Sequence, residues 1–256
     1  MILRISDIIN EKFRLINGIY VHSDICLDSI IYKYIKKEFF HEMMQKQQLY
    51  VANRSSFSDR RERQWKENLK MIFLLTPALS SQDEKRYYME LANKIDEAYS
   101  LCISCWTFDK HKGCDESITN WKCYGEDTFR IETTIEDLIY SIRPTDKSII
   151  ISPVYYEKSE YDGTVYNAIF KKYISYQDEQ EVRMCILSSE QCVRLDIDTS
   201  KLIHKVRLSP FFSIEQNKKD KEELKKLYKS LSPLVELSHM YEYQNKDIVP
   251  SQNAIP

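Results

Sequence analysis

One run of five residues, Glu179-Gln180-Glu181-Val182-Arg183, combines residue types that can do chemistry at a regular spacing. In an extended chain, residues two apart share a face, so Glu179, Glu181 and Arg183 are expected to point the same way. Neighbouring carboxylates raise each other's pKa and a guanidinium opposes this, so the trio can hold one oriented negative charge. The structural alternative is a solvated strand face or a local ion pair.

Composition limits the function classes. The chain has 256 residues, is 43% apolar and carries a formal charge of −2, which favours a folded protein without global attraction to nucleic acid or anionic membranes. Four glycines argue against a glycine-rich phosphate loop. Seven scattered cysteines suit a reducing compartment. We therefore expect a soluble, cytoplasmic protein with no membrane partner.

Hydrophobic periodicity predicts an α+β protein with a largely antiparallel sheet. Residues 29–242 are expected to form a single domain, with a helical hairpin insertion at about 60–99 and a flexible tail at 243–256. The N-terminal segment, residues 1–28, is ambiguous, and an amphipathic helix packed on the body is one interpretation. Strands are predicted at 29–35, 49–52, 101–107, 129–133, 148–156, 181–187, 192–197, 202–208 and 234–240, and helices at 36–47, 60–74, 82–99, 116–124, 134–142 and 218–231.

Four sequence blocks, in order, resemble an uncharacterised bacterial family known only as a domain of unknown function. They span about residues 30–240 and correspond to that family's "YKY", "LYFS…SFNDPFE", "ISCW…ES…MW..Y" and "hEkEvR…isP" motifs. The departures are Ser58, Arg60 and the lack of a glycine-rich strand after Gly125. The blocks are Tyr32-Lys33-Tyr34; Leu49–Ala52 with Ser55–Glu62; Ile103–Trp106 with Glu116-Ser117 and Trp121–Gly125; and Glu179–Arg183 with Leu208-Ser209-Pro210.

The order of the candidate residues is also similar to that of the ADP-ribosyltransferase superfamily: a basic residue on an early strand, a serine on a middle strand and a glutamate on a late strand. This resemblance implies a split antiparallel sheet that grips NAD without a glycine-rich phosphate loop. The resemblance concerns the fold and the order of the candidate residues along the chain. NAD would be consumed as a substrate, and no metal is expected.

The same resemblance implies roles for individual residues. Glu181 would stabilise the oxocarbenium-like transition state as nicotinamide leaves, and Glu179 would orient or deprotonate the accepting group. Lys33 would contact the diphosphate or a ribose hydroxyl of the cofactor, and Ser104 would hydrogen-bond the nicotinamide ribose. Tyr124 or Trp121 could stack on a ring. Tyr34 and Arg183 would also contribute to cofactor binding.

Each of these residues also has a structural interpretation. Lys33 can extend from its strand with its stem on apolar neighbours, and Ser104 can be a satisfied buried hydroxyl. Trp106 and Trp121 fit a hydrophobic core. Arg183 can pair structurally with a glutamate.

A second hypothesis is a zinc site formed by Cys102, Cys105, His111, Cys114 and Cys123. The spacing disfavours it. If 101–107 is a strand, the first two cysteines lie on opposite faces, and no glycine or proline turn separates them. Buried free thiols are the alternative.

A third hypothesis is a non-enzymatic protein that binds nucleic acid or a nucleotide. Arg54, Arg60, Arg61 and Arg63, beside Phe57 and Trp65, form a local basic patch within residues 54–70 that could contact phosphates. A solvated helix face explains the same pattern.

The favoured expectation is an NAD-consuming enzyme that transfers ADP-ribose to a macromolecule, nucleic acid or protein, or hydrolyses NAD. An intracellular toxin or anti-phage defence effector, with an inhibitory or regulatory partner, would suit such a chain.

Overall fold

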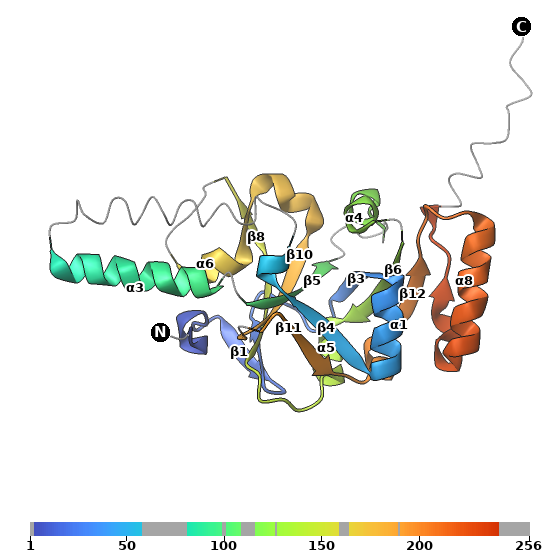
Figure 1. Ribbon diagram of the computed structural model, residues 1–256, viewed down its shortest axis with the longest axis horizontal. Helices are drawn as coiled ribbons and strands as arrows, with labels where there is room; N and C mark the ends of the chain where they lie inside the picture. Colours follow the sequence, from blue (N-terminus) through green and yellow to red (C-terminus); the bar gives the residue numbers. More distant parts are fainter. Residues whose placement is uncertain are drawn as a thin grey trace, which may run out of the picture.

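A computed structural model describes residues 3–57, 81–98, 101–108, 116–125, 127–158, 164–188 and 190–240. The protein is α+β, with a mostly antiparallel mixed sheet, as the sequence predicted. Eleven of the described strands form this sheet, which lies at the centre of Figure 1 with helices around it. No helix in the described ranges is long and apolar enough to cross a membrane.

In the middle of the chain the observed strands lie close to those predicted from the sequence. Their bounds are β1 (Phe13–Ile16), β2 (Ile19–His22), β3 (Ile30–Lys36), β4 (Gln48–Asn53), β5 (Cys102–Phe108), β6 (Thr128–Thr134), β7 (Ile149–Pro153), β8 (Tyr155–Glu157), β9 (Lys171–Tyr173), β10 (Glu181–Ile186), β11 (Cys192–Asp196), β12 (Lys205–Leu208) and β13 (Val235–Glu236).

The described helices pack on both faces of the sheet, and several begin at a side chain that accepts a backbone N–H. Thr134, Thr164 and Ser213 cap helices in this way. The bounds are α1 (Lys37–Lys46), α3 (Gln82–Ala98), α4 (Ile118–Tyr124), α5 (Ile135–Ser141), α6 (Val165–Phe170), α7 (Thr199–Leu202) and α8 (Ile214–Leu227), and the 3-10 helix η5 covers Ile174–Glu179.

The sheet forks at β5. Along one edge, β5 pairs with β10 from Cys102 to Thr107, all but its last residue. Along the other edge it pairs with β3 only at its end, at Thr107 and Phe108, and with β4 only at its start, at Cys102 and Ile103. One branch therefore continues as β3-β6-β12-β13 and the other as β4-β11.

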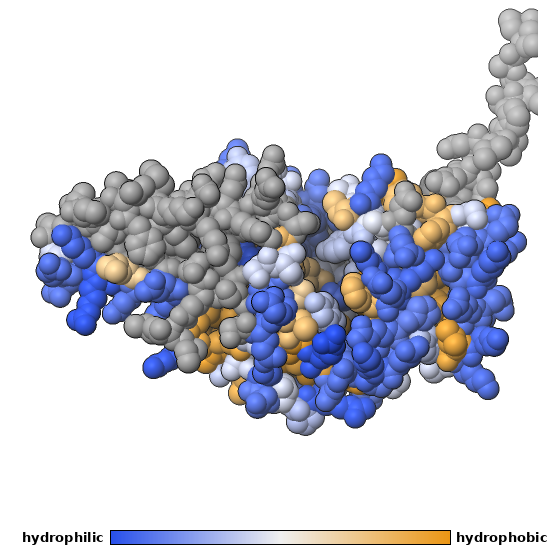
Figure 2. Space-filling model, in the orientation of Figure 1, coloured by the Kyte–Doolittle hydropathy of each residue, from blue (hydrophilic) through white to orange (hydrophobic). Residues whose placement is uncertain are grey.

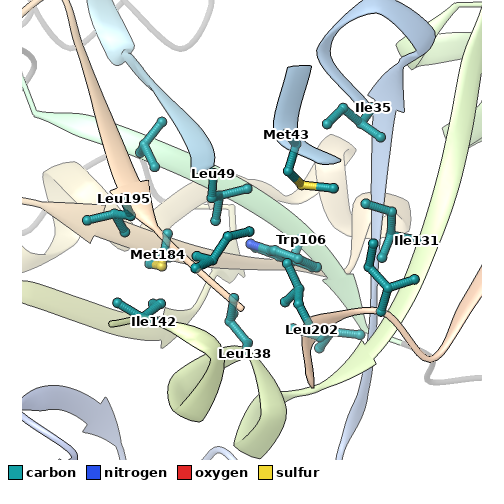
Figure 3. Close-up of a cluster of buried hydrophobic side chains, with 14 of the residues drawn as sticks. Ile35, Met43, Leu49, Trp106, Ile131, Leu138, Ile142, Met184, Leu195 and Leu202 are labelled. Atoms are coloured by element: carbon teal, nitrogen blue, oxygen red, sulfur yellow. The ribbon is translucent and has the colours of Figure 1, made fainter. Parts of the chain in front are cut away.

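The main hydrophobic core lies on one face of the forked sheet, beneath α1, α5, α7 and α8. Figure 3 shows Trp106 at its centre, with Leu49 and Met184 on one side and Ile131 on the other. Each of these four side chains is at most 1% exposed. In Figure 2, hydrophilic residues cover the outer surfaces of α1 and α8, so these helices are amphipathic covers of the core.

The opposite face carries a second, smaller cluster beneath α6. It contains Leu3, Ile8, Leu101, Ile103, Ile150, Val165, Ala168, Ile169, Phe170 and Cys185. This cluster stops short of the end of β10 at which Glu181 lies, and charged residues take its place there.

The N-terminal segment is a correction to the sequence interpretation. Residues 13–22 form the hairpin β1–β2 where an amphipathic helix was considered, and β2 pairs in parallel with β7. Asn17 and Gly18 both have positive φ, 49° and 77°, as a tight hairpin turn requires. The segment therefore belongs to the same sheet as the rest of the described chain.

Other differences are local. The predicted strand 148–156 is two strands, β7 and β8. The predicted strand 202–208 is shorter, because α7 ends at Leu202 and β12 begins at Lys205. Helix α8 starts four residues earlier than expected, at Ile214, because Ser213 caps it. The predicted helix 82–99 is confirmed as α3, whereas the helix at 60–74 and the tail at 243–256 lie outside the described residues.

Candidate functional site

The candidate site is a group of buried charges where β10 begins. Glu181 is 3% exposed and Arg183 is fully buried. Arg183 Nε donates to Glu181 Oε1 at 2.8 Å and Nη2 to Oε2 at 3.2 Å, while Nη1 donates to the Ile169 carbonyl oxygen at 2.6 Å. The predicted shared face of Glu181 and Arg183 is confirmed, and Arg183 takes the structural pairing considered for it.

Lys172, on β9, joins this pair to Glu179. Its Nζ lies 2.7 Å from Glu181 Oε2 and 2.6 Å from Glu179 Oε2. Lys172 is 9% exposed, so a lysine and a glutamate are both removed from water here. Burying charged groups is costly unless they pair, and the two carboxylates and two cations form a neutral group.

Glu179 reaches the group by a different route from the one predicted. It ends η5 rather than lying in the strand, and Gln180 follows in the left-handed conformation, with φ 46° and ψ 48°. The Glu179 side chain is 33% exposed, far more than that of Glu181. Of the two carboxylates, Glu179 is therefore the one that solvent reaches.

Residues from β8, β9 and η5 lie over Glu181, and we call these residues, 155–157 and 171–179, the cover segment. β8 and β9 pair with each other in parallel and form a separate two-stranded sheet. The Tyr156 hydroxyl accepts the backbone N–H of Glu181 at 2.8 Å. Lys172 Nζ lies 5.3 Å from the centroid of the Tyr176 ring.

The electrostatics keep Glu181 ionised. Burial would raise its pKa, but the charges of Arg183 and Lys172, with hydrogen bonds from Arg183 and from the Cys105 thiol, hold its pKa well below the ordinary glutamate value. Glu181 is thus a permanent anion at neutral pH, held by cations on two sides.

Lys33 and Ser104 meet at the fork, on the other face of the sheet. Lys33 Nζ donates to Ser104 Oγ at 3.0 Å and to the Cys105 carbonyl oxygen at 3.3 Å. Ser104 pairs with Met184 and shares the face of Trp106, whereas Cys105 pairs with Arg183. Burial lowers the pKa of Lys33, with Cys105 and Glu181 opposing the shift.

This placement separates the predicted residues. Lys33, Ser104 and Glu181 lie on three neighbouring strands, β3, β5 and β10, but Ser104 faces away from Glu181 and is 2% exposed. Lys33 and Ser104 are hydrogen-bonded to each other where the sheet forks. The contact expected between Ser104 and a ligand beside Glu181 is therefore not available in this arrangement.

Tyr34 and Tyr124 lie on the same side of the sheet as Glu181. Their rings stack at 5.1 Å with an interplanar angle of 6°, and Trp121 meets Tyr34 edge-on. Trp121 is fully buried, as a core residue. The Tyr124 side chain is 39% exposed, but burial of its hydroxyl, followed by the charges of Cys105, Glu181 and Glu179, raises its pKa.

The basic patch is only partly described. Arg54 is 3% exposed, and its Nη1 donates to the Ala168 carbonyl oxygen at 2.6 Å. Its guanidinium lies inside the protein rather than on a surface that nucleic acid could contact. Arg60, Arg61 and Arg63 lie outside the described residues.

The cysteines follow strand alternation. Cys102 pairs with Ile186 and packs in the main core, whereas Cys105 pairs with Arg183 on the opposite face. Cys123 is exposed, and Cys114 lies outside the described residues. Within the described ranges, no group of three or more metal-ligating side chains is found.

Three contributors to the site were not assigned to it from the sequence: Lys172, Tyr156 and the Cys105 thiol, which was considered only as a zinc ligand. The pattern of residues 155–173 shows basic and aromatic side chains but does not indicate which glutamate they meet. Their partners are fixed by the separate pairing of β8 with β9.

A comparison with protein-family models found no match, and comparisons with curated proteins and with solved structures found none either.

Proposed function

We propose that the protein is an NAD-consuming enzyme of the ADP-ribosyltransferase type, which transfers ADP-ribose to a macromolecule or to water. The observation that carries the proposal is the charge group at the start of β10, where Glu179 and Glu181 share one ammonium and both carboxylates influence Tyr124 of the Tyr34–Tyr124 stack. Buried, strongly perturbed carboxylates concentrate at functional sites. The forked sheet is consistent with the proposal.

The chemistry assigns a separate task to each carboxylate. The bond between ribose C1′ and the nicotinamide nitrogen breaks, nicotinamide leaves with the electron pair, and positive charge develops at C1′ and the ring oxygen. Glu181, which stays ionised, stabilises that charge. The hydroxyl of the acceptor or of water attacks C1′, and its proton passes to the more exposed Glu179.

Other residues support these two. Arg183 fixes the Glu181 carboxylate through two hydrogen bonds and acts as a positioning residue. Tyr124, which is partly exposed and stacked on Tyr34, offers a flat surface for an aromatic ring of the substrate. In the described structure the cover segment, which includes Glu179, closes over Glu181. Catalysis therefore requires that segment to open for substrate entry and to close again so that Glu179 reaches the attacking hydroxyl.

The test is nicotinamide release from NAD by the purified protein, with and without added protein and nucleic acid as acceptors. Wild type is expected to release nicotinamide, and Glu181→Gln is expected to lose about 100-fold or more in rate, the usual scale for a transition-state electrostatic contact.

The matched control is Glu190→Gln, which removes an exposed glutamate that pairs with Lys147 on the surface. It is expected to retain wild-type rates. Thermal unfolding of both variants checks that each is folded. No release by wild type with any acceptor, or equal rates in wild type and folded Glu181→Gln, would count against the proposal.

A further inference from the structure

We infer that His22, Asp24 and Tyr155 form a latch that holds the cover segment closed, and that protonation of His22 releases it. The inference concerns how the site opens and does not depend on which reaction the site carries out.

The latch joins the start of the cover segment to the end of β2. Tyr155 is the first residue of β8, and His22 is the last residue of β2. The Tyr155 hydroxyl donates to Asp24 Oδ2 at 2.8 Å and lies 3.4 Å from His22 Nδ1. A hydrogen bond to a carboxylate is stronger than one between neutral groups, so this contact favours the closed position of β8.

The latch is continuous with the contacts that close the site over Glu181. On one side of Tyr155, the Val154 N–H donates to the Glu181 carbonyl oxygen at 2.9 Å. On the other side, the Tyr156 hydroxyl accepts the Glu181 N–H at 2.8 Å. Withdrawal of Tyr155 with β8 would free that N–H, so the Glu181 amide reports directly on the position of the cover segment.

His22 can act as the sensor because it is buried and neutral. It is 2% exposed and lies among the rings of Phe13, Tyr155 and Tyr166, at centroid distances of 5.0, 5.9 and 6.1 Å. Its Nδ1 accepts the backbone N–H of Asp24 at 3.2 Å. The neutral ring therefore carries its proton on Nε2.

Two charges and two tyrosines surround His22 in the described part of the chain. Burial lowers the pKa of His22, the negative charge of Asp24 opposes this shift, and the positive charge of Lys12 adds to it. Burial also raises the pKa of Tyr155, and raises that of Tyr166 to about 12, so both hydroxyls stay neutral. Near neutral pH, the group here that changes its protonation state is therefore His22.

Protonation of His22 removes the interactions that keep Tyr155 in place. A hydrogen on Nδ1 faces the Asp24 N–H, so both groups become donors and their hydrogen bond is lost. The charged ring is attracted instead to Asp24 Oδ2, 3.8 Å away, which is the oxygen that accepts the Tyr155 hydroxyl. A buried imidazolium also lacks solvation, and withdrawal of Tyr155 lets water reach it.

The other two rings around His22 are held by contacts outside the latch. The Tyr166 hydroxyl lies 2.9 Å from Oγ of Ser152, which is fully buried. Phe13 is the β1 residue that pairs with His22 in the hairpin. Tyr155 belongs to the separate β8–β9 sheet, so its ring can move away from His22 without breaking the main sheet.

The direction of the pH dependence follows from the two states of His22. In the open state the hydrated ring binds a proton with the ordinary pKa of 6.5, whereas the closed state binds one only at lower pH. Opening is therefore independent of pH above 6.5 and becomes more favourable below it, by at most about tenfold per pH unit, until the closed state is also protonated.

The experiment measures hydrogen exchange of the Glu181 amide by NMR at about pH 7.5 and about pH 5, corrected for the intrinsic exchange rate at each pH. In wild type, the opening equilibrium constant of this amide is expected to be about tenfold larger at the lower pH. His22→Gln keeps an acceptor for the Asp24 N–H but does not titrate in this range. Its opening constant is expected to be the same at both pH values.

The matched control is His204→Gln. His204 also lies beside an aspartate, with its Nε2 2.9 Å from Asp137 Oδ2, but its side chain is 39% exposed and it belongs to neither the latch nor the cover segment. The Glu181 amide of this variant is expected to keep the wild-type dependence on pH. Loss of the dependence in this control would assign it to charge effects outside the latch and would overturn the inference.

Tyr155→Phe tests the latch without a change at His22 and covers the case in which His22→Gln does not fold. It removes the hydrogen bond to Asp24 Oδ2 and keeps the ring, so the Glu181 amide is expected to open about tenfold more than in wild type at about pH 7.5. The amides of β1 are the internal reference in every sample, because fraying of the hairpin would also expose His22.

The inference is overturned if the opening constant of the Glu181 amide does not change with pH in wild type, or if folded His22→Gln shows the same change as wild type. An equal change in the β1 amides would also overturn it, since the hairpin would then open in place of the cover segment. No substrate is present in these samples. Failure of the latch is therefore distinguishable from failure of the proposed reaction, which is measured by nicotinamide release.

Discussion

The two faces of strands β5 and β10 differ sharply, although alternate residues of the same two strands form both. On one face Trp106, Val182 and Met184 enter the main apolar core. On the other, Glu181 and Arg183 are equally buried but are paired through charge. Strand alternation alone places these side chains on opposite sides.

The faces are stabilised in different ways. Apolar burial contributes in proportion to area and tolerates substitutions that keep the volume. The charged face depends on complete pairing, because a buried ion that loses its partner bears the whole cost of desolvation. The charged group takes the place that the apolar cluster beneath α6 would otherwise fill, and the proposed function rests on it.

The largest expected effect is that of Arg183→Met, which removes one of the two cations paired with Glu181 and a donor to the Ile169 carbonyl oxygen. We expect a loss of about 3–5 kcal/mol in the free energy of unfolding, measured by urea denaturation. The double variant Glu181→Gln/Arg183→Met should recover part of the loss, since the carboxylate is gone. Arg183→Met with wild-type stability would show that the pairing does not hold this face together.

Met184→Ala tests the apolar face of β10 at the position next to Arg183. Met184 is fully buried in the main core, and its truncation should cost about 2–4 kcal/mol in the same measurement. Met184→Leu, which keeps the volume, should cost less than about 1.5 kcal/mol. If the two substitutions cost the same, packing at this position would not be the source of stability.

The smallest expected effect is a dependence on pH that only the charged face shows. The pKa of Glu181 is lowered in the folded state, so its contribution is fully present above its ordinary value of 4.5 and is lost as the pH falls through the lower folded value. The stability difference between wild type and Glu181→Gln should therefore narrow below pH 4.5, by at most about 1.4 kcal/mol per pH unit. Met184→Ala should differ from wild type by a constant amount over that range.

Much of the secondary structure could be predicted because its signals are local. The continuous apolar run around Ile103 and Trp106, and the cap at Thr134, identify β5 and α5 without reference to the rest of the chain. The hairpin β1–β2 had an equally local signal, Asn17-Gly18 between apolar residues. The interpretation of residues 1–28 missed it by weighing helical periodicity instead.

The site was harder to predict. The sequence indicated that Glu181 and Arg183 would share a face, and the structure confirms this. It could not show that Ser104 faces away from them, because that depends on which strand edge β10 pairs with and in which register. A shift of one residue would have brought Ser104 to the charged face.

The sequence by itself determined the alternation of the strands and therefore which neighbours of Glu181 lie on its side of the sheet, because side-chain direction in a strand is a property of the local backbone. Only the tertiary structure decided that the Glu181 carboxylate would be buried beneath Lys172 and Tyr156. Those contacts join segments that are set by long-range packing and by the pairing of β8 with β9, and no spacing in the chain encodes them.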